Sequence, residues 1–69
     1  MMQRKRHFRK IAVHEAQVEN GVIRPAIVVL DDDIVIECRP LLYEEERTEW
    51  WGGEYVAHKN KKITKLNNY

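Results

Sequence analysis

Side chains that could carry out chemistry are few and scattered along this chain of 69 residues. There is no serine, and the single cysteine, Cys38, lies in an alternating apolar run with no histidine beside it. His7, His14 and His58 show none of the spacings that are typical of zinc sites. A nucleophile, a base and an orienting group are not supplied together, so the sequence predicts a protein that is not an enzyme and uses no metal or cofactor.

Two acidic stretches are also expected to be solvated surface rather than sites. The triplet at residues 31–33 lacks the alternating ligands, the glycine and the distant glutamate of a calcium loop. Aspartates favour turns through local hydrogen bonds to the backbone, so this triplet predicts a turn. The acidic run at residues 44–46, with Glu49 after it, predicts a solvated face.

The most distinctive stretch is EWWGGEY at residues 49–55. A tight turn at Gly52-Gly53 would place Trp50 opposite Tyr55 as a cross-strand aromatic pair. Trp51 would then point into the core, because neighbouring residues on a strand face opposite ways. Two interpretations of Trp50 and Tyr55 stay open at this point: they only stabilise a hairpin, or they form part of a binding surface.

A first hairpin is indicated by Asn20-Gly21, which stands between two β-rich runs. This pair is preferred in two-residue turns because both positions need a positive φ. Such a turn would set Val18 opposite Ile23 and Ile11 opposite Leu30, with side chains alternating between two faces.

The aspartate triplet would form the next loop. With all three aspartates in the loop, Leu30 faces Ile34, whereas a two-residue loop would bring Glu37 and Arg39 into the apolar face. Matching of apolar residues favours the longer loop. The predicted core face then consists of Ile11, Val13, Ala26, Val28, Leu30, Ile34, Ile36 and Cys38.

The segment at residues 40–51 fits either a helical turn or a strand. Pro40 and the acids after it suit a helix start, but no apolar stripe follows, which favours a strand near residues 46–51. A further turn is expected at Lys59-Asn60. The predicted fold class is all-β: a small antiparallel meander of five or six strands, sandwich-like or a small open barrel, with one short helical turn near residues 40–47 as the alternative there. We expect a loose basic arm at residues 1–8, one β domain at 9–66 and a frayed end at 67–69.

The second face of the first three strands is unusually apolar for an antiparallel sheet, which normally shows one face to water. Either later strands cover this face or another subunit does, and a chain this short favours a homodimer or another protein partner. The candidate interface consists of Val18, Ile23, Ile27, Val29, Val35, Trp50 and Tyr55.

Charge is distributed unevenly, with nine of the twelve basic residues at the two ends and all eleven acids between them. Basic ends beside exposed aromatics make single-stranded nucleic acid the alternative partner, bound by a small β-barrel. Its candidate contacts are Arg4, Lys5, Arg6, Arg9, Lys10, Lys61, Lys62 and Lys65. No apolar stretch is long enough for a membrane helix, and no apolar run follows the basic start as in a signal peptide, so we expect a cytoplasmic protein with no membrane partner.

Overall fold

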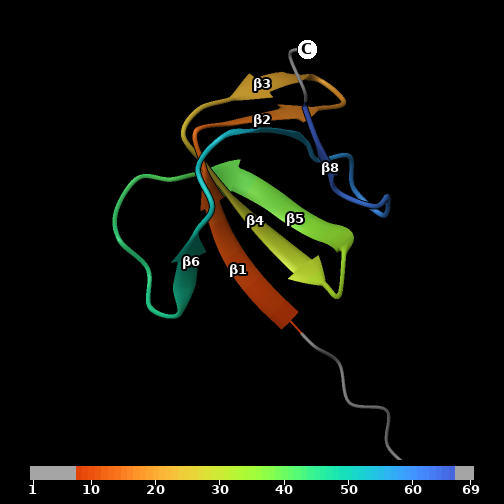
Figure 1. Ribbon diagram of the computed structural model, residues 1–69. Helices are drawn as coiled ribbons and strands as arrows, with labels where there is room; N and C mark the ends of the chain where they lie inside the picture. Colours follow the sequence, from red (N-terminus) through yellow and green to blue (C-terminus); the bar gives the residue numbers. More distant parts are fainter. Residues whose placement is uncertain (1–7, 67–69) are drawn as a thin grey trace, which may run out of the picture.

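The computed structural model describes residues 8–66, and this part of the chain consists of strands and turns without a helix (Figure 1). The predicted all-β class is confirmed. The strands are β1 (Phe8–Val13), β2 (Glu15–Val18), β3 (Gly21–Ile23), β4 (Ala26–Asp31), β5 (Ile34–Pro40), β6 (Thr48–Trp50), β7 (Glu54–Val56) and β8 (Thr64–Lys65). The predicted basic arm, apart from Phe8, and the predicted frayed end lie outside the described residues. Residues 41–47 form an irregular connection without the helical turn, whereas the strand favoured near residues 46–51 is confirmed as the shorter β6.

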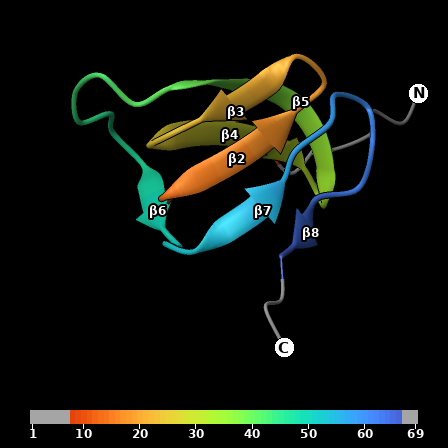
Figure 2. The ribbon, with the colours of Figure 1, turned by 90° about the horizontal axis from the view of Figure 1, so that it is seen from above.

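The strands form two mixed sheets of four strands, in the orders β5-β4-β1-β6 and β3-β2-β7-β8. Figure 2 shows β2, β3 and β7 lying in front of β4 and β5. β6 runs parallel to β1 and β7 runs parallel to β2, whereas the other pairs are antiparallel. The fold therefore departs from a purely antiparallel meander, because the chain crosses over from β5 to the far edge of its sheet instead of turning back.

Three long strands bend together where one sheet passes into the other. β1 continues into β2 at His14, β3 into β4 at Arg24-Pro25, and β6 into β7 through Gly52-Gly53. His14 falls opposite Pro25 when the register of the flanking pairs is continued. On its other side, the amides of His14 and Glu15 both donate to the Gly53 carbonyl, at 3.0 and 3.2 Å. The two sheets thus share bent strands and enclose one core.

The first hairpin turns at Glu19-Asn20, so the predicted turn at Asn20-Gly21 and its register are wrong. Val18 lies opposite Gly21 and Ile11 opposite Val28. Proline explains the difference, since it has no amide hydrogen to donate within a ladder. The observed register places Pro25 at the bend, where the predicted register would have placed it within the ladder, opposite Ala16. The shift is by two residues, so each side chain of β1 and β4 keeps its predicted face.

The loop between β4 and β5 contains two residues, Asp32-Asp33, so the predicted three-residue loop is wrong. A β-bulge offsets the change: Leu30 pairs with Val35 and Val29 with Glu37, which leaves Ile36 as the extra residue. Val35 is therefore fully buried, while Ile34 is 36% exposed and Ile36 partly exposed. The bulge returns Glu37 and Arg39 to the outer face, which is why the short loop is tolerated.

The core between the sheets draws on both of them. Its buried members are Ile11, Val13, Ala16, Ala26, Val28, Leu30, Val35, Tyr55 and Ala57. Residues 60–63 close the core beside β5, where the Val35 amide donates to Lys61 O at 2.8 Å and Ile63 packs on the core. This segment follows the Lys59-Asn60 turn, which is confirmed.

Because of the two-residue loop and the bulge, we expect Val35 to contribute more to stability than Ile34, which is the opposite of what the predicted alternation of faces would give. We expect Val35→Ala to lower the free energy of unfolding by about 2 kcal/mol, because it removes buried apolar groups and leaves a cavity. Ile34→Ala removes a larger but partly exposed group and should cost less than about 1 kcal/mol. Urea unfolding of both variants measures the difference. A larger loss for Ile34→Ala would contradict the two-residue turn and the bulge.

Candidate functional site

The irregular connection at residues 41–47 crosses the outer face of the first sheet on its way from β5 to β6. Pro40 ends β5, and the Leu41 amide donates to Pro25 O at 3.0 Å as the chain leaves the strand. Arg47 has a φ of 59° and turns the chain into β6. Because three of the seven residues are glutamates, the connection brings acidic side chains over a face that contains Lys10 and Arg39.

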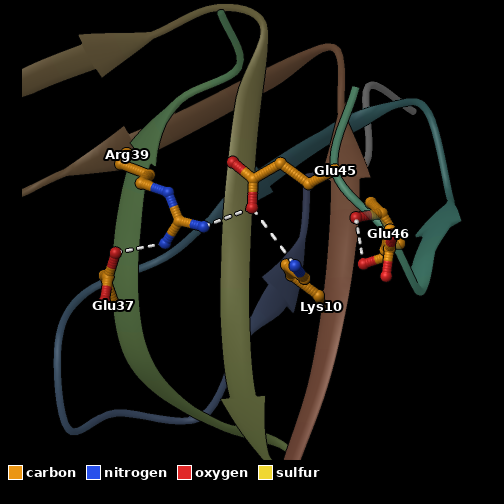
Figure 3. A network of polar contacts seen from close by, with 6 residues as sticks. Lys10, Glu37, Arg39, Glu45 and Glu46 are labelled. Carbon is orange, nitrogen blue, oxygen red and sulfur yellow. Dashed lines mark hydrogen bonds and ion pairs between the residues drawn. The ribbon is translucent and has the colours of Figure 1, made fainter. Parts of the chain in front are cut away.

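Glu45 fastens this connection to the sheet. Figure 3 shows its carboxylate between Arg39 of β5 and Lys10 of β1. Lys10 Nζ lies 3.2 Å from the carboxylate, Arg39 also pairs with Glu37, and the Glu45 side chain is only 13% exposed. The hydrogen bond from Arg39, followed by that from Lys10, holds the pKa of Glu45 below its ordinary value. Glu45 and Glu37 in turn raise the pKa of Arg39.

A pocket of about 420 Å³ opens between this connection and β6. We call it the crossover pocket; it is lined by Ala12, Leu41, Glu44, Glu45, Thr48 and Trp50. Its volume lies within the range of about 300 to 1,000 Å³ that is usual for small-molecule sites. The sequence neighbours of Leu41 are also accessible, since Leu42 and Tyr43 are 80% and 70% exposed.

Trp50 forms one wall of the crossover pocket and is 59% exposed. The His14 ring supports the indole edge-on, with ring centroids 4.9 Å apart. Gly52 lies beside this contact, since a Cβ there would be 3.4 Å from Trp50 Nε1 and 3.5 Å from His14 Cδ2, which are ordinary van der Waals distances. Gly52 also has a φ of 65°, which a residue with a side chain rarely adopts. The indole is thus held in place while much of its surface stays accessible.

The predicted pairing of Trp50 with Tyr55 is wrong. Gly52-Gly53 does not turn the chain back but carries it from the first sheet into the second, so β6 and β7 do not pair. Tyr55 packs in the core and lies 5.6 Å from Trp51, centroid to centroid. The prediction that Trp51 points into the core is also wrong, because Trp51 is 36% exposed and has the Arg9 guanidinium 5.4 Å from its ring centroid.

Three of the seven candidate interface residues lie inside the single chain. The exposure expected of Ile27, Val35 and Tyr55 is wrong, because all three are buried. Ile23 packs against the core, and Val18 and Val29 are partly buried. Ile27 is buried within the chain, on the face that the connection at residues 41–47 crosses, so an irregular connection takes the place of the later strands expected there.

The basic candidates are dispersed, and several are already paired. Arg9 binds Glu49 at 2.7 Å, Lys10 binds Glu45, and Lys62 lies 3.6 Å from Asp33. The other two within residues 8–66, Lys61 and Lys65, are exposed. Arg4, Lys5 and Arg6 lie outside the described residues.

Other chemistry is poorly supported by the described part of the chain. Burial raises the pKa of the Cys38 thiol to about 11, so the thiol stays protonated near neutral pH and is a weak nucleophile. Residues 8–66 contain no group of three histidine, cysteine or acidic side chains arranged to hold a metal ion. In the same range, no helix has the length and apolar character needed to cross a bilayer.

Sequence reasoning missed Glu45 and the other residues that line the crossover pocket, except Trp50. The available signal was the presence of two cations, Lys10 and Arg39, beside a single carboxylate, Glu37, on a largely apolar face, since the second cation requires a carboxylate from elsewhere. No protein-family model matches the chain, and neither curated proteins nor solved structures give a match.

The Glu45 ion pairs predict a specific dependence of stability on pH. The pKa of Glu45 in the folded protein lies below its ordinary value of 4.5. The ion pairs of Glu45 therefore contribute fully to the free energy of unfolding above about pH 4.5, and this contribution is lost as the pH falls through the pKa of Glu45 in the folded protein. We expect Glu45→Gln to be less stable than wild type at pH 7 and to lose less stability on acidification below about pH 4.5.

Urea midpoints measured between about pH 7 and pH 3 test this expectation. Glu44→Gln is the matched control, because Glu44 makes no ion pair within residues 8–66. The control should lose as much stability on acidification as wild type. Equal losses for Glu45→Gln and wild type would show that the ion pairs do not fasten the connection.

Proposed function

We propose that this protein is a non-enzymatic interaction module that binds a protein partner at the crossover pocket. The observation that carries the proposal is the position of Trp50, a supported but largely exposed indole on the wall of an open pocket. Tryptophan is enriched among the residues that dominate binding energy at interfaces, and such residues usually fill pockets of the partner or line them.

The surroundings of Trp50 support the same proposal. Leu42 and Tyr43 add exposed apolar surface beside Leu41, and accessible aromatic and aliphatic side chains are common at interaction sites. The ion pairs of Glu45 and the ring contact of His14 hold the pocket walls in the unbound chain. A pocket that is already formed loses less conformational entropy on binding.

Self-association at this surface is one form that the interaction can take. The homodimer predicted from the apolar second face loses that basis, because Ile27 is buried within one chain. A dimer would instead cover Trp50, Leu42 and Tyr43. Light scattering of the Trp50→Ala variant beside wild type separates this form from binding of a different protein.

Selection of peptides tests the proposal directly. A random peptide library is panned on wild type and counter-selected on Trp50→Ala, with retained fold verified by circular dichroism. We expect enriched peptides to shift the resonances of Trp50 and Thr48, and to bind Trp50→Ala at least about 30-fold more weakly, as for an interface hot spot.

The matched control for this selection is Val22→Ala, which truncates an exposed apolar residue on the edge strand β3 of the other sheet. It should bind the selected peptides as wild type does. Peptides that bind Trp50→Ala and wild type equally, or that shift β3 resonances instead, would refute a site at the crossover pocket.

Single-stranded nucleic acid is the weaker candidate. Phosphates would have to compete with the carboxylates that already pair with Arg9, Lys10 and Lys62. We expect labelled single strands to bind weakly even at about 50 mM salt, where release of counterions favours such complexes most. Tight binding measured by fluorescence anisotropy at that salt, and lost near 200 mM, would reverse this ranking.

A further inference from the structure

The charges around the crossover pocket indicate what kind of side chain it takes. We infer that it binds a positively charged side chain of the partner, lysine or arginine, through Trp50 and Glu44; this inference rests on the proposed function. Two of the six lining residues are carboxylates and none is a cation. The residues that line the pocket therefore include acidic side chains and no basic ones.

The two carboxylates differ in what they can still bind. Glu45 is occupied, since Lys10 and Arg39 both pair with it. Glu44 is exposed and makes no ion pair within residues 8–66. An incoming cation can pair with Glu44 without displacing Lys10 or Arg39, so binding leaves the connection fastened to the sheet.

The other walls suit the remaining parts of a basic side chain. A cation is attracted to the face of an indole, and tryptophan is the strongest of the aromatic residues in this respect. The same chain already contains such a contact elsewhere, with Arg9 over the ring of Trp51. Ala12 and Leu41 offer apolar surface on which the methylene groups of lysine or arginine can pack.

Other ligand classes fit the pocket less well. An apolar side chain would remove water from the Glu44 carboxylate without supplying a partner, which is unfavourable. An acidic side chain would meet the carboxylate of Glu44, which has the same charge, and be repelled. A basic side chain is the class that satisfies the carboxylate, the indole and the apolar walls together.

Three blocked tripeptides test the inference, with lysine, norleucine or glutamate between two glycines. Norleucine is the matched probe because its aliphatic stem resembles that of lysine but carries no charge. Titrations are followed by the resonances of the Trp50 indole N–H and the Thr48 amide. We expect the lysine peptide to bind about 5-fold more tightly than the norleucine peptide, and the glutamate peptide to cause no shift.

Two glutamate variants test whether the preference for lysine over norleucine comes from Glu44. Glu44→Gln should lower affinity for the lysine peptide about 3-fold and leave the norleucine peptide unaffected. Glu46→Gln is the matched control, since Glu46 is an exposed glutamate of the same connection that does not line the crossover pocket. It should bind all three peptides as wild type does.

The inference fails if norleucine binds as tightly as lysine, if the lysine peptide leaves the Trp50 resonance unmoved at about 10 mM, or if Glu46→Gln weakens binding as much as Glu44→Gln does. These outcomes are distinct from failure of the proposed function. Selected peptides that lack lysine and arginine but depend on Trp50 would retain the interaction module and overturn the preference for a cation. An absence of any Trp50-dependent peptide would remove the module itself.

Discussion

The fold depends on three strands bending at the same place. Each strand can bend there for a reason of its own: Pro25 has no amide to donate, Gly52 and Gly53 have φ values of 65° and 71°, and the His14 amide is directed to Gly53 O. Because these three bends lie side by side, each strand can pass from the first sheet into the second at the same level. A chain of 69 residues with one cysteine thereby gains two layers around a common core without a disulfide.

The same bend decides what the two tryptophans do. Trp50 precedes the glycine pair and is 59% exposed, whereas Trp51 is 36% exposed and its ring lies beside that of Tyr55. Gly52 lies beside the contact between the His14 ring and Trp50, so the bend and the exposed indole are neighbours in the structure.

Alternation along the sequence predicted the faces of β1 and β4 correctly, including Ile11, Val13 and Val28, because burial selects apolar residues with a period of two. It failed at β5, where a bulge adds one residue and reverses the faces of Ile34 and Val35. It also failed at Gly52-Gly53, since a glycine pair permits a hairpin turn and a passage between sheets equally well. Local sequence patterns indicate which face of a sheet a side chain occupies. They do not indicate which distant strands become neighbours, such as β1 and β6.

The crossover pocket was hidden from sequence reasoning for a related reason. Glu45 lies in an acidic run that resembles any solvated surface, and its partners are 35 residues before it and six residues before it. Ion pairs near a surface contribute little to overall stability, so their main effect here is to hold the connection in one position. Glu45 and Glu37 together balance the charges of Lys10 and Arg39, which leaves Glu44 beside Trp50 without an ion pair within residues 8–66. The pair that positions the connection thus sets the electrostatic character of the pocket beneath it.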